Sequence, residues 1–369
     1  MVTNWVTVAS ENFPAFTASG TVRYGFEGVG WTTKTINGAS SCTGSTFGNV
    51  DPAPGLMKYC QIQLSAPNVV QTGAAPVINT ALLPPAQRGY STENVTGGGT
   101  FLTNADIGAF RTTCGVSHFA FNDPIVFPGQ PGMSHLHMFF GNTGVNANTT
   151  ATSLTASGDS TCAGGTANRT GYWVPAMVNL KTGAPVVPST SVWYYKAGYR
   201  GVDSAAVKPF PAGLRMIAGD SHGTTPIPTG DVIRFICQAD GVIRGGIPSC
   251  PVGQTIEIIV IFPQCWDGVN LDSPDHKSHM AYGTGTGCPS THPVGLPEVS
   301  LNISYTVVDA NPDQNWKLSS DNYAGQGGYS MHADWFYGWK DDIMKTWVTK
   351  CINPKNSSSN SICDGRYLQ

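Results

Sequence analysis

The sequence contains few charged residues. Asp, Glu, Lys and Arg make up 12% of its 369 residues, about half of the ~25% found in an average soluble protein. The 20 basic and 23 acidic residues form no blocks of one sign, and the formal net charge is -3. Proteins that bind nucleic acids or anionic membranes need a concentrated positive charge. We therefore expect neither partner.

Long hydrophobic runs are also absent. No segment approaches the ~18–20 apolar residues of a membrane-spanning helix, so we expect no insertion into a membrane. The first ten residues lack the basic stretch followed by an apolar stretch that marks a secretion signal. We expect a soluble protein whose signal, if the protein is exported, has been removed.

Several common motifs of enzyme and cofactor sites are missing. The chain has no P-loop and no H-E-x-x-H, and its Gly-rich stretches do not precede a helix. We therefore expect no bound nucleotide. There is no C-x-x-C pair and no C-x-x-C-H, which excludes a zinc ribbon, a thioredoxin-like site and covalently attached c-type haem.

Ten cysteines are present, and their even number suggests five disulfides and hence a secreted protein. Spacing alone does not fix their connectivity, but pairing of sequential neighbours gives short, plausible loops. The expected bridges are Cys42 with Cys60, Cys114 with Cys162, Cys237 with Cys250, Cys265 with Cys288, and Cys351 with Cys363.

The 44 glycines and 26 prolines indicate a turn-rich, mainly β chain. Residues 1–65 are predicted to be a small β accessory module, because short alternating runs at 5–9, 21–26, 31–36 and 58–64 stand between turn-forming clusters. Residues 66–99 are rich in Ala, Pro, Thr and Gly and are predicted to be a linker or an extended segment. The main domain is expected to occupy residues 100–369.

The main domain is predicted to be a β-sandwich or jelly-roll-like domain with long loops. Its clearest strands are expected at 192–200, 232–239, 255–262 and 298–308, the last with Val299, Leu301, Ile303 and Tyr305 on one face. One convincing helix is expected at 340–350, where apolar residues recur at helical spacing.

Histidines provide the first candidate site. His135 and His137 stand two residues apart in the segment PGMSHLHMFFGN, and in a strand such residues point to the same face. Two imidazoles on one face could bind a metal ion such as Cu or Zn, or a substrate. The alternative is a pair of partly exposed histidines at the end of a strand.

A second candidate lies in the polar segment 262–282, FPQCWDGVNLDSPDHKSHMAY. Asp272, Asp275, His276 and His279 are concentrated there without an amphipathic period. This density suits a metal site, a general acid and base, or a surface that binds hydroxyl groups. The alternative is a rigid loop in which the carboxylates cap turns.

Two further segments add candidates. His292 stands between two prolines in CPSTHPV, and GYSMHADWFYGW places His332 and Asp334 among aromatic residues. Tyr329 or Trp335 could stack on sugar rings. The alternative is that the aromatic residues form a core beneath the terminal helix.

From about Phe110 to Cys351 the chain resembles a family of secreted fungal and bacterial proteins built on a domain of unknown function. The resemblance rests on HLHMFFGN, YWVPAM, LRMIAGD, FPQCWDGVNLDSPDHKSHMAY, CPSTHPV and GYSMHADWFYGW. It adds Trp173 and Arg215 to the candidate residues, and it implies an extracellular role linked to glycans. Many relatives have Gly-Asp-Tyr where this chain has Ala333, Asp334 and Trp335. Residues 1–65 look like a small bacterial module found on exported proteins.

We therefore expect a secreted polysaccharide-active enzyme, either a glycoside hydrolase or a lyase, with a cleft lined by His and Asp. Asp272 and Asp334 are the predicted pair of catalytic carboxylates, with His135, His279 and His332 assisting. The predicted substrate-binding residues are His137, Trp173, Arg215, Asp275, His276, His292, Tyr329 and Trp335. One alternative is a non-catalytic carbohydrate-binding or cell-surface protein. Another is a Cu- or Zn-dependent secreted enzyme centred on His135 and His137, for which a divalent metal would be the cofactor.

Overall fold

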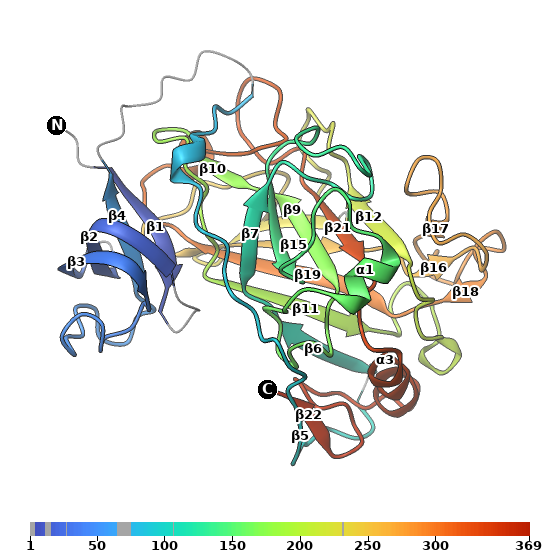
Figure 1. Ribbon diagram of the computed structural model, residues 1–369. Coiled ribbons are helices and arrows are strands. Elements are labelled where there is room, and N and C mark those ends of the chain that lie inside the picture. Colours follow the sequence, from blue (N-terminus) through green and yellow to red (C-terminus); the bar gives the residue numbers. More distant parts are fainter. Residues whose placement is uncertain (1–3, 12–15, 27, 65–74, 106, 231) are drawn as a thin grey trace.

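The computed structural model describes residues 4–11, 16–26, 28–64, 75–105, 107–230 and 232–369 (Figure 1). Strands make up 34% of the chain and helices 8%, which confirms the mainly β fold. Residues 66–74 of the predicted linker lie outside the described residues.

A six-stranded antiparallel sheet forms one layer of the main body. Its order is β14-β13-β15-β19-β11-β6. The strands are β6 (Ala109–Thr113), β11 (Thr190–Lys196), β13 (Ile233–Cys237), β14 (Ile243–Arg244), β15 (Thr255–Ile261) and β19 (Glu298–Thr306). The four strands expected from alternation correspond to β11, β13, β15 and β19. The apolar face predicted for β19 is buried.

A five-stranded antiparallel sheet forms the second layer, with the order β12-β21-β9-β8-β7. The strands are β7 (Val116–Ala120), β8 (His137–Gly141), β9 (Gly171–Pro175), β12 (Arg215–Gly219) and β21 (His332–Phe336). These strands are short and come from Gly-rich stretches. They are therefore recognised from their pairing in the sheet and not from a pattern in the sequence.

The two sheets pack face to face around one continuous core. Tyr172 of β9 and Trp193 of β11 meet across this core with ring centroids 3.9 Å apart. The Tyr195 hydroxyl on β11 accepts hydrogen bonds from the indole nitrogens of Trp335, at 3.3 Å, and Trp339, at 2.8 Å. The main body is thus a β-sandwich in which hydrogen bonds as well as aromatic contacts join the two layers.

Strand alternation gives the five-stranded sheet two different faces. On β8, Met138 and Phe140 enter the core between the sheets, whereas Phe139 packs in a separate cluster on the other face. On β21, Trp335 belongs to the core and Phe336 to that separate cluster. Because side chains alternate with a period of two, His137, His332 and Asp334 all lie on the face that points away from the core.

The N-terminal strands form their own sheet, in the order β1-β4-β2-β3 (Figure 1, blue). They are β1 (Asn4–Ser10), β2 (Phe16–Phe26), β3 (Gly30–Ser40) and β4 (Tyr59–Leu64). This sheet has a small core of its own, which includes the Cys42–Cys60 bridge. The Tyr59 hydroxyl hydrogen-bonds Thr306 on β19. The predicted division at residues 65 and 99 stays a prediction.

The remaining elements are short. Their bounds are η1 (Thr80–Leu82), β5 (Val95–Gly97), α1 (Ala151–Ala156), β10 (Met177–Asn179), η2 (Ser204–Ala206), β16 (Cys265–Trp266), β17 (Met280–Ala281), β18 (Val294–Gly295), α2 (Pro312–Asn315), β20 (Trp316–Leu318), α3 (Asp341–Thr346), η3 (Trp347–Ile352) and β22 (Arg366–Leu368). The helix expected at 340–350 is present as α3 continued by the π-helical η3. The sequence interpretation missed α1 and α2, which are too short to show a period.

Five disulfides join the cysteine pairs expected from sequential pairing. All ten cysteines are oxidised. None of the described helices has the length and apolar character needed to cross a membrane.

Candidate metal centre

Three histidines meet on the outer face of the five-stranded sheet: His137 on β8, His332 on β21, and His135 two residues before His137, just ahead of β8. The ring centroids of His135 and His137 are 4.1 Å apart, and those of His135 and His332 are 4.9 Å apart. The Nε2 atoms of His137 and His332 are separated by 3.4 Å. One potential ligand atom from each ring lies within 4.8 Å of the others. Four ligands at zinc–nitrogen distances would be about 3.3 Å apart in a tetrahedral site, so the spacing suits a common metal ion.

Backbone carbonyls fix which nitrogen of each ring carries the proton. His137 Nδ1 donates to the Asn122 carbonyl at 2.9 Å, and His332 Nδ1 donates to the Ser330 carbonyl at 2.9 Å. Because a carbonyl can only accept, both Nδ1 atoms are protonated, and in the neutral rings both Nε2 atoms carry lone pairs that face each other. A metal-binding histidine is usually oriented in this way through its other nitrogen.

Burial keeps these imidazoles neutral. It lowers the pKa of His137 to about 4 and, together with the neighbouring His137, lowers that of His332 to about 4. Burial and the same neighbours also lower the pKa of His135, whose Nε2 is buried without a hydrogen-bond partner. Neutral imidazole is the form that binds a metal ion.

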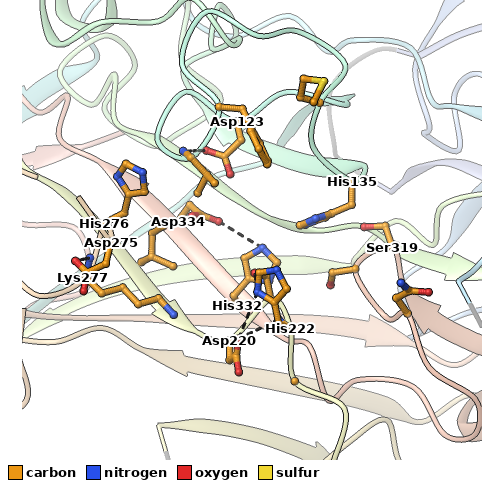
Figure 2. A pocket seen from close by; sticks show the side chains of 18 of the residues that line it. Asp123, His135, Asp220, His222, Asp275, His276, Lys277, Ser319, His332 and Asp334 are labelled. Carbon is orange, nitrogen blue, oxygen red and sulfur yellow. Dashed lines mark hydrogen bonds and ion pairs between the residues drawn. The ribbon is translucent and has the colours of Figure 1, made fainter. Parts of the chain in front are cut away.

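Two buried carboxylates adjoin the imidazoles. Asp334 is fully buried, and neither of its oxygens has a hydrogen-bond partner among the described residues. Its Oδ2 lies 3.8 Å from His332 Nε2 (Figure 2). Asp123 is also buried, but its Oδ1 accepts from the backbone nitrogens of Ile125 and Val126. Burial and the nearby Asp123 raise the pKa of Asp334 well above its usual value.

The cluster lies at an open cleft of about 730 Å³. Asp123, His135, His332 and Asp334 line it together with residues from the surrounding loops (Figure 2). These loop residues include Asp220, Ser221, His222, Thr224, Asp275, His276, Lys277, Ser319, Ser320 and Asn322. His135 is partly exposed, whereas His137 and His332 are buried. A metal ion held here would therefore keep one side open to the cleft.

Only some of the other predicted site residues lie at this cleft. Asp275 and His276 line the cleft with the histidine cluster. Asp272 does not line it, because the side chain pairs with Arg215 at 3.0 Å and with His276 Nδ1 at 2.9 Å. The structure therefore does not bring the expected pair of catalytic carboxylates together in this cleft. Arg215, the partner of Asp272 in this ion pair, does not line the cleft either.

Two predicted histidines have structural partners on both ring nitrogens. His279 bonds the Ser273 hydroxyl at 2.9 Å and the Arg215 carbonyl at 2.7 Å. His292 bonds the Thr291 hydroxyl and the Ser278 carbonyl, both at 2.9 Å. Neither ring has a nitrogen left for a substrate or a metal ion, so both are assigned to positioning of the 262–295 loops.

The prediction that aromatic side chains stack on sugar rings in the cleft is wrong for the three candidates. Trp173 and Trp335 are fully buried, the first beneath the cleft and the second in the core between the sheets. Neither has a free face for a sugar ring. Tyr329 stacks on Tyr323 at 5.1 Å and is not among the residues that line the cleft.

Asp123 and Lys277 were missed by the sequence interpretation. Asp123 stands in FNDPIVF, where an Asp before a proline is typical of a turn. Nothing in the sequence connects this turn with β21, some two hundred residues later. Lys277 is the only Lys or Arg among the described residues lining the cleft, and its Nζ donates to the Gly219 carbonyl at 2.6 Å.

A family model described as "Domain of unknown function (DUF1996)" matches residues 123–339. The matched region begins at Asp123 and ends just beyond β21, so it contains every residue of the histidine and aspartate cluster. No solved structure matches the chain. Because the family model covers more than half of the sequence, the chain belongs to the DUF1996 family.

Proposed function

We propose that this protein is a secreted metal-dependent enzyme that acts on polysaccharides, with its metal ion bound by His135, His137 and His332 and by the carboxylate of Asp334. One observation carries the proposal. Two buried Nε2 lone pairs face each other across 3.4 Å, beside a buried carboxylate without a hydrogen-bond partner.

This arrangement of buried polar groups is more favourable with a bound cation than without one. Two acceptors cannot hydrogen-bond each other, and buried polar groups without partners cost about 1–3 kcal/mol each. A buried unpaired carboxylate costs more. A divalent ion would satisfy all of these groups at once, and nitrogen-rich ligand sets favour Zn, Cu, Fe or Ni over Mg or Ca.

The open side of the cluster favours catalysis over a structural role. Structural zinc sites are closed by four protein ligands, whereas catalytic sites leave a position for water or substrate. Here the partly exposed His135 and the buried Asp334 both line the cleft. A metal ion bound there would polarise a substrate oxygen or lower the pKa of a bound water.

The lining of the cleft supports a polyhydroxylated substrate. Hydroxyl groups of Ser221, Thr224, Ser319 and Ser320 and the amide of Asn322 surround the cluster. Such groups exchange hydrogen bonds readily with sugar hydroxyls. The volume of about 730 Å³ would hold a few sugar units. The five disulfides support an extracellular location.

Metal analysis of protein purified without chelators tests the metal centre. We expect about one equivalent of a transition metal in the wild type and a loss of that metal in His137→Ala and His332→Ala. His222→Ala is the matched control, because His222 lines the same cleft with a side chain that is 94% exposed. No bound metal in the wild type after exposure to Zn²⁺ or Cu²⁺, or full occupancy in His137→Ala, would refute the metal centre.

A screen of polysaccharides tests the reaction. New reducing ends alone would indicate a hydrolase, and absorbance of an unsaturated uronate would indicate a lyase. We expect His135→Ala to abolish whichever activity appears, and His222→Ala to retain it. A protein that holds its metal and binds glycans but cleaves none would instead be a carbohydrate-binding protein.

A further inference from the structure

A second feature lies on the opposite side of the sandwich from the cleft. Side chains on the outer face of the six-stranded sheet alternate with those in the core, so Tyr194 and Lys196 of β11 point outward while Trp193 and Tyr195 are buried. Across the sheet, Tyr194 is paired with Arg111. Lys196 is paired with Glu298.

This surface carries an excess of positive charge. We call it the basic face and define it as Arg111, Lys196, Arg200 and Arg234, with Tyr194, Tyr199 and Tyr282, around the single carboxylate of Glu298. Lys196 Nζ lies 3.9 Å from Glu298 Oε1, and Arg200 Nε lies 3.8 Å from Glu298 Oε2. Two of the four cations therefore form ion pairs with the same acid, although the whole protein has a net charge of -3.

The next carboxylate along this sheet does not relieve the imbalance. Glu257 on β15 accepts hydrogen bonds from Gln238 and Asn302, both at 2.7 Å. No ion pair joins it to the four cations within the described residues. Within the described residues, Glu298 is therefore the carboxylate that pairs with the cations of the basic face.

The cations of the basic face are partly dehydrated. The side chain of Lys196 is 19% exposed and that of Glu298 is 4% exposed. Arg234 has a buried Nε without a hydrogen-bond partner. Burial, and then the charge of Arg234, lower the pKa of Lys196, against the opposing effect of Glu298. An anion bound between these groups would pair the orphaned donor and reduce the repulsion.

Tyrosine rings alternate with the cations. Lys196 Nζ lies 5.6 Å from the ring centroid of Tyr194 and 4.9 Å from that of Tyr199. Arg200 lies 5.2 Å from the Tyr282 ring. Tyr199 is 37% exposed, so part of its surface is open to a ligand. Aromatic rings suit the apolar faces of sugars, and neighbouring cations suit their carboxylate or sulfate groups.

We propose that the basic face binds an acidic polysaccharide at a second site, separate from the cleft. The side chains combine charge with aromatic surface on a sheet whose strands are about 4.8 Å apart, which provides repeated contacts for a repeating polymer. A nucleic acid is the other polyanion that these cations could attract, and its binding is an outcome of the test below. This site goes beyond the proposed function and does not depend on a metal ion.

Affinity electrophoresis in gels containing polygalacturonate tests the proposal with the full chain. We expect retardation of the wild type that is lost when the carboxylates are methyl-esterified. Lys196→Gln and Arg234→Gln should each weaken binding about tenfold, the change that corresponds to about 1.4 kcal/mol. Tyr199→Ala provides a third variant at an exposed position that does not depend on repacking of the sheet. Unfolding temperatures would confirm that each variant is folded.

Two control variants distinguish binding at the basic face from a general effect of charge and from binding in the cleft. Arg366 on β22 forms an ion pair with Asp364, and Arg366→Gln, which removes one positive charge there, should leave the retardation unchanged. His135→Ala should also leave it unchanged, whether or not the metal centre exists. Equal retardation of the wild type and all three basic-face variants would overturn the proposal. Equal retardation by methyl-esterified pectin, or tighter binding to a single-stranded polynucleotide, would also overturn it.

Discussion

Replacement of Asp334 by Asn should stabilise the metal-free protein and reduce the further stabilisation that a bound metal ion adds. Without a metal ion, the wild type keeps a fully buried carboxyl group with no hydrogen-bond partner, either charged or protonated against its ordinary pKa. The amide of Asn is neutral and nearly the same size, and it can donate to the lone pair of His332, whose Nε2 lies 3.8 Å from the carboxylate. The substitution should therefore stabilise the metal-free protein.

The size of this effect follows from the cost of an unpaired buried group. A gain of about 1–3 kcal/mol is expected, and a domain of this size shifts its Tm by about 2 °C or more for each kcal/mol. We expect chelator-treated Asp334→Asn to unfold about 2–6 °C above the chelator-treated wild type. At a metal concentration 100 times its Kd, the wild type gains about 2.7 kcal/mol from binding, whereas a variant with tenfold weaker affinity gains about 1.4 kcal/mol.

Scanning calorimetry with and without Zn²⁺ measures both effects, and Asp321→Asn is the matched control. Asp321 is also fully buried, but its carboxylate accepts hydrogen bonds from the backbone nitrogens of Leu318 and Gly328 and from the hydroxyls of Tyr323 and Ser330. Asp321→Asn should destabilise the metal-free protein by about 2–4 kcal/mol. If Asp334→Asn destabilises the metal-free protein to a similar extent, Asp334 has partners in the apoprotein and the reasoning fails.

Three further predictions concern groups outside the cluster. Burial lowers the pKa of His118 to about 4, below its unfolded value of about 6.5, so the unfolded chain binds more protons and about 2–3 kcal/mol of stability should be lost between pH 6.5 and 4. His118→Gln should flatten this part of a denaturation profile, and an unchanged slope would contradict the assignment. His279→Ala should lower the free energy of unfolding by about 2–3 kcal/mol yet leave the metal content unchanged, as elemental analysis would show. Tyr195→Phe should cost about 2–4 kcal/mol in urea unfolding, because it removes the acceptor of the Trp335 and Trp339 indoles; a loss below about 0.5 kcal/mol would show that these donors have other partners.

Local patterns predicted much of the fold. Alternation located β19, and helical spacing located the buried stripe of α3 and η3, because each pattern spans enough residues to be distinctive. Sequential pairing of cysteines succeeded because each bridge closes a short loop. The strand β21 was missed because the alternation of apolar and polar residues from Met331 to Trp335 is only five residues long and runs into the continuous apolar stretch from Trp335 to Tyr337.

The candidate site was predictable only where its residues stand close together in the sequence. The two-residue spacing of His135 and His137 predicted a shared face, and the same spacing holds for His332 and Asp334. That these two pairs face one cleft depends on β9 lying between β8 and β21, and the order of strands in a sheet is not written in any short segment. The approach of Asp123 from a distant turn is non-local in the same way.

The polar segment 262–282 shows why density of acids is a weak indicator of a site. Asp267 accepts hydrogen bonds from the backbone nitrogens of Val269 and Asn270. Asp275 accepts from the backbone nitrogen of Ser278 and from two serine hydroxyls. These contacts lie within four residues, as in Asx turns, and they fit the alternative interpretation that the carboxylates cap turns. A carboxylate engaged in its own loop is not free to act on a ligand.

Charge balance points to the kind of ion that the cluster would bind. Asp123 and Asp334 place two acidic groups in a buried region, where burial and the neighbouring Asp123 raise the pKa of Asp334. A bound cation would favour the ionised form of both groups, which together carry two negative charges. Three neutral imidazoles add donors but no charge. One divalent cation would make this set neutral, whereas a monovalent cation would leave a buried charge and a trivalent ion would introduce one. In a chain with so few charged residues, two buried acids beside three imidazoles are thus best explained by a divalent, nitrogen-preferring metal ion.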